Sequence, residues 1–158
     1  MSKILIFFLV LCLSAVCAKA EPTSALSGLK QFQLLIEDLS QSDPKCGITE
    51  DLVRRALMDS AASQKFKIVD RSTVAFYVKI ATLRTANGTC MSVTSVDLRA
   101  AQNVQLAFSG EEHFVRVLLW SNVWFDTSPG GNAHKKQIRK TLEEASLQFI
   151  DDWQSANK

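Results

Sequence analysis

Cysteine, proline and glycine are all scarce in this sequence. The chain of 158 residues contains four cysteines, three prolines and six glycines, and it has no internal repeat or low-complexity tract. No C-x-x-C or H-x-x-x-H pair places two metal ligands on one turn, and no glycine-rich loop has the spacing of a P-loop. These absences exclude the familiar zinc and nucleotide motifs, and we expect no cofactor and no metal.

Catalytic motifs are also missing. The segment 108–110, Phe-Ser-Gly, lacks the preceding glycine of the G-x-S-x-G nucleophile elbow. Neighbouring carboxylates, such as those at 111–112, point in different directions on a strand or helix and indicate solvated surface charge. We therefore predict that the protein is not an enzyme. The alternative is an exported hydrolase with a site near His113 or His134.

The one long hydrophobic run lies at the N-terminus. Lys3 precedes an unbroken apolar run over residues 4–13, and small residues follow at 18 and 20, an order typical of a secretory signal peptide. We predict that residues 1–20 are a signal peptide and residues 21–158 a single mature domain. A retained membrane anchor is the alternative, but the run is shorter than the roughly 20 residues that span a bilayer.

A lipid anchor on Cys17 is a further alternative. Val16 stands where a lipobox has glycine, alanine or serine, so we do not expect lipidation. No later apolar run approaches spanning length, and no transmembrane segment is expected after signal cleavage. The predicted location is secreted or periplasmic.

Neither sign of charge is in excess in the predicted mature chain. The full sequence has 18 lysines and arginines against 16 aspartates and glutamates. Lys3 and Lys19 lie in the predicted signal peptide, and their removal brings the net charge to zero. A neutral chain provides no electrostatic argument for nucleic acid or an anionic membrane as partner.

Signal cleavage leaves two cysteines, Cys46 and Cys90. In an oxidising compartment an even pair indicates one disulfide. Together with His113 and His134 they reach the four ligands of a structural zinc site, which is the alternative, but their spacing fixes no pair of ligands. A Cys46–Cys90 bridge would contribute about 4 kcal/mol on the chain-entropy model.

Hydrophobic periodicity predicts one α+β domain. The segment 74–83 alternates apolar and mixed residues, whereas 114–125 is apolar on both faces and should be central or covered on both sides. Apolar stripes predict one helix from the N-cap Thr49 to Ala61 and another over 132–153. We expect a two-layer sandwich with both helices on one face of a mainly antiparallel sheet. The remaining strands are predicted at 31–39, 66–69, 90–98 and 104–108.

The stretch 85–90, TANGTC, joins two of these strands. Asn87 and Gly88 both tolerate the positive φ that a tight hairpin turn requires. The return strand changes its apolar phase, which predicts a β-bulge near Thr94 and Ser95. Asn87 also begins an Asn-Gly-Thr sequon on the exposed tip, a candidate glycosylation site whose use depends on the host.

Two further groups of residues are candidate binding sites. His134, Lys135 and Lys136 stand at the start of the last helix, where lysines oppose the helix dipole, and a bound anion would relieve that conflict. The alternative is a solvated helix end. Trp120, Trp124 and Phe125 are a candidate partner surface, although aromatic residues at this spacing are more often part of the core.

A resemblance extends over most of the predicted mature chain. The segment 45–49 (KCGIT) before a helix, the hairpin 76–98 and the terminal 149–153 (FIDDW) resemble a group of small exported bacterial proteins without assigned activity. The order of elements is more loosely similar to α+β modules of bacterial envelope proteins, such as the N-terminal domain of TolB and transport-auxiliary proteins. The resemblance implies binding of a partner without catalysis, and a bacterial host in which Asn87 would usually remain bare.

These observations predict a small secreted or periplasmic non-enzymatic protein that binds a protein partner of the cell envelope. The hydrolase remains the first alternative, and a secreted inhibitor or effector directed at another cell is the next. The oligomeric state and the identity of the partner have no signal in the sequence.

Overall fold

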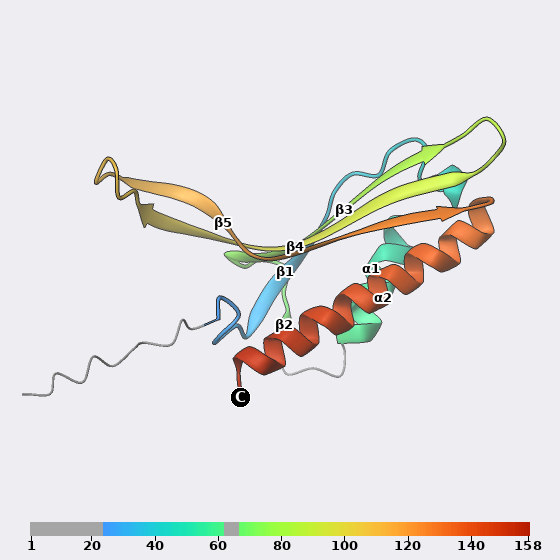
Figure 1. The fold of residues 1–158 in the computed structure, drawn as a ribbon. Helices are drawn as coiled ribbons and strands as arrows, with labels where there is room; N and C mark the ends of the chain where they lie inside the picture. The colour runs from blue at the N-terminus through green and yellow to red at the C-terminus, as the bar shows by residue number, and fades with distance from the viewer. Residues whose placement is uncertain (1–23, 62–66) are drawn as a thin grey trace, which may run out of the picture.

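The computed structural model describes residues 24–61 and 67–158 (Figure 1). The predicted signal peptide, residue 66 and the junction at residue 21 lie outside the described residues. The described chain forms a five-stranded sheet, one short 3-10 helix and two α-helices. In chain order the elements are β1 Gln31–Ile36, η1 Pro44–Cys46, α1 Glu50–Ala61, β2 Lys67–Ile68, β3 Val74–Arg84, β4 Cys90–Gln105, β5 Glu112–Ser128 and α2 Gly131–Ala156.

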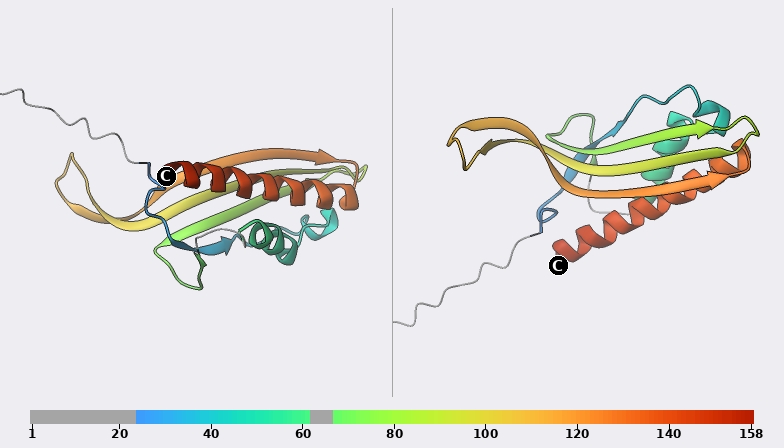
Figure 2. Two further views of the ribbon diagram at one scale, coloured as in Figure 1. Left: turned by 90° about the horizontal axis from the view of Figure 1, so that it is seen from below. Right: turned by 45° about the horizontal axis from the view of Figure 1, so that its top comes forward.

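The sheet has the strand order β2-β1-β3-β4-β5. Strand β1 pairs in parallel with β2 and β3, whereas β3, β4 and β5 form an antiparallel meander. Figures 1 and 2 show α1 and α2 together on one face of this sheet. The α+β prediction with both helices on one face is confirmed. The sheet is mixed, but most of its paired residues belong to the two antiparallel ladders.

The hairpin between β3 and β4 reverses where the sequence predicted it. Thr85 N donates to Thr89 O at 2.9 Å, and Arg84 pairs with Cys90 on either side of the loop. Of the two residues at the tip, Gly88 has a positive φ of 87°, whereas the φ of Asn87 is negative. The reversal is therefore a loop of residues 85–89 and not the tight two-residue turn that both positive φ values would give.

Strands β4 and β5 differ most from the sequence prediction. The bulge lies between Leu98 and Arg99 and not near residues 94–95, and β4 continues to Gln105. Residues 106–111 form the turn, so residues 104 and 105 belong to β4 and residues 106–108 of the predicted strand do not form one. Strand β5 is the edge of the sheet, which corrects the expectation of a central strand. One of its apolar faces packs toward the helices, and the other stays exposed.

Beyond the bulge, β4 and β5 continue as a two-stranded arm. We define the arm as residues 100–118, in which Ala100 pairs with Val117 and Gln105 with Glu112. It projects away from both helices (Figures 1 and 2). Phe108 and Phe114 lie 88% and 74% exposed on it, because no helix reaches this part of the sheet.

The helices begin where local chemistry allows. Thr49 caps α1, since its Oγ1 accepts a hydrogen bond from Leu52 N at 3.2 Å. A side chain on Gly47, whose φ is 79°, would place its Cβ 2.8 Å from Gly131 O. Gly47 is therefore required where η1 meets the start of α2. Helix α2 covers the predicted 132–153 and extends it by a residue or more at each end.

The core lies between the sheet and the two helices. Phe149 of α2 is its centre, with ring centroids 5.1 Å from Phe76, 5.5 Å from Trp120 and 5.9 Å from Phe32. Aliphatic side chains from β3, β4 and both helices complete the same cluster. Burial of these apolar side chains is the main favourable contribution to folding. The fully buried members include Ile48, Val53, Val78, Val96, Leu98, Ile138 and Leu142.

Candidate binding face of the sheet

One face of the sheet carries no helix, and we call it the open face. Along β4 the side chains of Ser92, Thr94, Val96 and Leu98 point toward the helices and are buried. The intervening residues, from Met91 to Arg99, point the other way. Their cross-strand neighbours on β3 and β5 share this face, because opposite residues of an antiparallel pair lie on the same side.

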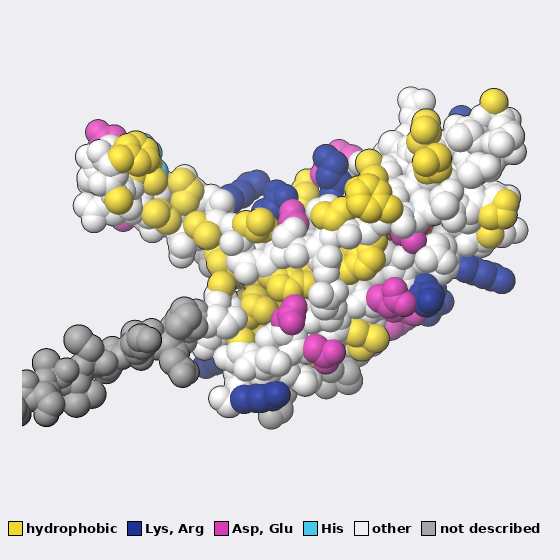
Figure 3. All heavy atoms as spheres, viewed as in Figure 1, with side chains coloured by type: hydrophobic (Ala, Val, Ile, Leu, Met, Phe, Trp, Pro, Cys, Tyr) yellow, Lys and Arg dark blue, Asp and Glu magenta, His cyan; other side chains and the backbone are white. Residues whose placement is uncertain are grey.

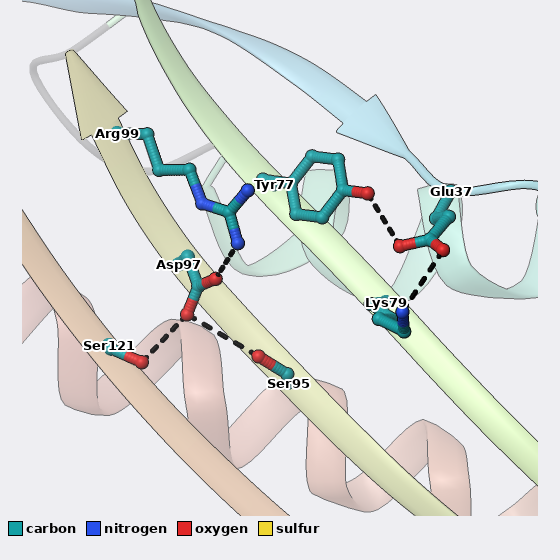
Figure 4. A network of polar contacts seen from close by, with 7 residues as sticks. All are labelled: Glu37, Tyr77, Lys79, Ser95, Asp97, Arg99 and Ser121. Carbon is teal, nitrogen blue, oxygen red and sulfur yellow. Dashed lines mark hydrogen bonds and ion pairs between the residues drawn. The ribbon is translucent and has the colours of Figure 1, made fainter. Parts of the chain in front are cut away.

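A polar network occupies the middle of the open face (Figure 4). Asp97 is its centre and is only 6% exposed. Its carboxylate accepts hydrogen bonds from Arg99 at 2.5 Å and from Ser121 and Ser95 at 2.7 and 3.3 Å. The Arg99 guanidinium also lies over the Tyr77 ring, 4.4 Å from its centroid. The network buries a carboxylate with its hydrogen bonds satisfied.

Glu37 and Lys79 extend the network toward β1. The Tyr77 hydroxyl donates to the Glu37 carboxylate at 2.5 Å, and Lys79 Nζ lies 3.2 Å from the same carboxylate. The hydrogen bond from Tyr77, followed by that from Lys79, lowers the pKa of Glu37. The same contact with Glu37, followed by burial, raises the pKa of Tyr77. Cations and anions are paired here, so the centre of the face has little net charge.

Near the β3–β4 hairpin the open face becomes apolar. Leu83, Met91, Val93, Val123 and Phe125 are all exposed there, and Phe125 most of all at 79%. A hollow of about 470 Å³ lies among four of them, with Leu83, Met91 and Val93 on one side and Phe125 on the other. We call this the apolar hollow. Figure 3 shows that the surface dips between the arm and this hairpin, with hydrophobic side chains along it.

The candidate aromatic surface is divided between the two faces. Trp120 and Trp124 pair across from Leu98 and Thr94 on the helix side and pack against the core. Trp120 Nε1 donates to Asp152 of α2 at 2.8 Å. Phe125 alone points onto the open face. The three residues therefore do not form one surface, because consecutive strand residues alternate in direction.

His134 is fully buried at the start of α2. Its Nε2 lies 2.7 Å from Ser92 Oγ and its Nδ1 lies 2.7 Å from Ser128 Oγ. Burial lowers the pKa of His134, against the weaker opposite effect of Asp126 and Asp43. Both ring nitrogens are thus engaged within the protein, whereas Lys135 and Lys136 are exposed. The proposed anion site at these three residues stays a prediction.

The two histidines lie far apart in the fold. His113 lies on the arm, with Nε2 3.5 Å from Glu111, while the first turn of α2 is at the other end of the sheet (Figure 1). Ser92 contacts His134 but is itself buried, and no described carboxylate hydrogen-bonds the His134 ring. The arrangement lacks the third, orienting acid of a serine triad.

Cys46 and Cys90 form the predicted disulfide, with their Cα atoms 5.8 Å apart. Both residues are fully buried, and the bridge ties η1 to the first residue of β4. Disulfide sulfurs are not zinc ligands, so the zinc alternative fails. In the part of the chain that the structure describes, no three histidine, cysteine, aspartate or glutamate side chains gather to hold a metal ion.

Asn87 lies exposed at the tip of the β3–β4 hairpin. Its Oδ1 accepts a hydrogen bond from Thr89 N at 3.3 Å, which helps to order the loop. The glycosylation site at Asn87 stays a prediction.

Sequence reasoning missed the polar network. Glu37 and Asp97 are 60 positions apart and belong to one network only because β1 pairs with β3 and β3 with β4. The one available signal was the polar alternation of Ser95, Asp97 and Arg99 around the apolar Val96 and Leu98. Such alternation predicts a face away from the core, but it does not predict which strands meet there.

Comparisons with known proteins identify no family. No family model matches the chain, and no curated protein matches it. One matching structure is titled "Crystal structure of a putative lipoprotein from Caulobacter crescentus CB15". It is 16% identical over 82% of this chain and 90% of that chain, with a TM-score of 0.36. A likeness this weak carries no argument about function, and the similarity to TolB stays a prediction.

The two helices were also compared with the length and hydropathy of membrane spans. Within residues 24–61 and 67–158, no helix has a stretch apolar and long enough to cross a bilayer.

Proposed function

We propose that this protein is an extracytoplasmic, non-enzymatic binding protein whose open face docks a protein partner of the cell envelope. The observation that carries the proposal is the apolar hollow on a sheet face that no described element covers. Leu83 is 60% exposed and Phe125 79% exposed there, side by side with a well-ordered polar network.

The composition of the open face favours protein as the partner. Interfaces place aromatic, methionine and aliphatic side chains at their centre and polar groups around them. Phe125 and Met91 of the apolar hollow match the apolar centre of such an interface. The adjacent network matches its polar surroundings, and its paired charges favour no polyanion. A contiguous exposed apolar patch of this sort typically marks an interaction site.

The disulfide supports an extracytoplasmic location. Disulfides form and persist in oxidising compartments and are rare in the cytosol of mesophiles. The predicted signal peptide points in the same direction. An envelope partner is then the class of protein that such a chain would meet.

Site-specific photo-crosslinking in the native host would test the proposal. A crosslinking residue would replace Phe125 in the apolar hollow or, as the matched control, Leu147, which is 56% exposed on α2. We expect one protein adduct from position 125 and none from position 147. The captured protein, once purified, should bind the wild-type chain directly.

A second variant links binding to the hollow itself. Phe125→Ser should weaken binding of the purified partner at least tenfold, because it removes a central apolar anchor. Leu147→Ser should leave the affinity unchanged. Equal adducts at both positions, or full affinity in Phe125→Ser, would remove the open face as the docking site.

A further inference from the structure

A second, smaller pocket opens on the same face at the base of the arm. We call it the arginine pocket. It has a volume of about 90 Å³, comparable with a small ionic group, and its polar lining comes from four separate segments of the chain. That lining consists of Gln33 of β1, Ser72 and Thr73 before β3, Tyr77 of β3, Arg99 of β4 and Arg116 of β5.

The two arginines have different partners. Arg99 is paired with Asp97, and its guanidinium is held over the Tyr77 ring. Arg116 is exposed on the arm, and no ion pair joins it to another of the described residues. Arg99 therefore offers donors in a fixed orientation, while Arg116 adds a charge that the protein itself does not neutralise.

Small residues between the arginines create the space. Ala75 and Ala101 line the bottom of the pocket, and Ala101 N donates to Thr73 O at 2.7 Å, which holds the segment before β3 in place. Ala75 is the cross-strand neighbour of Arg99 and Ala101 that of Arg116, so a larger side chain at either alanine would take up space in the pocket. The pocket thus combines a small volume with guanidinium donors from two neighbouring strands.

The balance of charge indicates which anion fits. Asp97 neutralises Arg99, and Glu37 neutralises Lys79, so one positive charge remains on this part of the face. A single carboxylate would balance it, whereas a dianionic phosphate would leave an excess negative charge beside Asp97. Arginine is also suited to planar, bidentate recognition of carboxylates.

We infer that the arginine pocket binds a carboxylate group of the docked partner, held between Arg99 and Arg116. This inference rests on the proposed function and adds a second recognition point to it. Arg99 is six positions along β4 from Val93 in the apolar hollow, which corresponds to about 20 Å along the strand. The partner would then present an acidic side chain or its C-terminus about 20 Å from its apolar anchor.

The pocket can be tested without the partner. Purified protein would be titrated with N-acetylglycine, its neutral amide and inorganic phosphate, while NMR follows backbone amides and arginine Nε–Hε groups. We expect saturable shifts with N-acetylglycine at Arg99, Arg116 and Thr73, and none with the amide. Arg116→Gln should weaken this binding about tenfold or more, because a charge-assisted contact is lost.

Arg84→Gln is the matched control, since Arg84 is exposed at the opposite end of β3 and likewise has no ion pair with a described residue. It should leave the affinity for N-acetylglycine unchanged. Equal shifts with the amide, or full affinity in Arg116→Gln, would overturn the inference. Tighter binding of phosphate would overturn the choice of a carboxylate. None of these results depends on crosslinking at Phe125, so the two proposals fail separately.

Discussion

The two faces of the sheet are built from the same strands and stabilised in different ways. On the helix side, Val96 and Leu98 are buried by packing against α1 and α2, with Phe149 at the centre. On the open face, Asp97 is almost equally buried, but by hydrogen bonds with Arg99 and Ser121 and by the neighbouring Tyr77. The difference shows that a sheet face without helices can be ordered at its centre by polar contacts alone.

The ends of the open face lack such cover. The apolar hollow lies near the β3–β4 hairpin, and the arginine pocket lies at the base of the arm, where it shares Tyr77 and Arg99 with the polar network. Both expose groups that the chain does not satisfy. Exposed apolar side chains and an unpaired guanidinium gain most from a partner. We therefore expect the helix side to determine stability and the ends of the open face to determine binding.

The strongest test of this division compares one phenylalanine from each face. Phe149→Ala should lower the free energy of unfolding by about 3 to 5 kcal/mol, because it leaves a cavity among Phe32, Phe76 and Trp120. Phe125→Ala should change it by about 0.5 kcal/mol or less, since Phe125 is exposed. Urea unfolding would measure both. Equal losses would show that the open face contributes to the core.

The disulfide also belongs to the helix side. It joins Cys46 to Cys90 across a sequence separation of 44, so its loss increases the entropy of the unfolded chain. We expect Cys46→Ala with Cys90→Ala to cost about 2 to 4 kcal/mol. Thermal unfolding of the double variant, compared with the oxidised wild type, would measure this. A midpoint unchanged from that of the oxidised wild type would contradict it.

Asp97→Asn tests whether the polar network holds the open face. The amide has one acceptor oxygen in place of two and no charge, so it can no longer accept from Arg99 and from both serines, and the ion pair with Arg99 is lost. We expect a loss of about 1 to 3 kcal/mol in the free energy of unfolding. Ser121→Ala removes one neutral donor and should cost less. If Asp97→Asn were neutral, the open face would not be ordered by this network.

His134 gives the helix side a pH dependence. Burial lowers its pKa from the ordinary value of 6.5, so on acidification the unfolded chain binds a proton before the folded one does. Stability should therefore fall as the pH drops from about 6.5 toward the lower pKa of the folded state, and this loss should level off below it. Urea unfolding across that range would detect it.

Two variants identify the group responsible for this dependence. His134→Gln should flatten the decline below pH 6.5, because the titrating ring between Ser92 and Ser128 is gone. His113→Gln, on the exposed arm, should retain it. An unchanged slope in His134→Gln would assign the acid sensitivity to other groups.

Several features could be predicted because they depend on neighbours in the sequence. The alternation in β3, the cap at Thr49, the stripe of α2 and the reversal near Gly88 are all local, and each is observed. The pairing of Cys46 with Cys90 is a distant contact, but only two cysteines remained to form it. The sequence prediction misplaced the bulge at Leu98 and the end of β4. The arm does not pack against the core, so its residues show no apolar alternation that would indicate the register.

The candidate binding face could not be predicted from the sequence, because it depends on contacts between distant segments. Strand alternation determines which residues share a side, but it does not say which of two apolar sides the helices will cover. Strand β5 is apolar on both, and only the placement of the helices leaves Trp124 partly buried and Phe125 exposed.

The sequence alone thus determined the helices and most strands, which follow from spacing along the chain, and the disulfide, which follows from the number of cysteines. Tertiary structure alone decided that Arg99 and Arg116 line one pocket and that Glu37 reaches Tyr77. Those contacts depend on strand order and register, which are determined by packing of the whole domain. The open face therefore exists only in the folded protein.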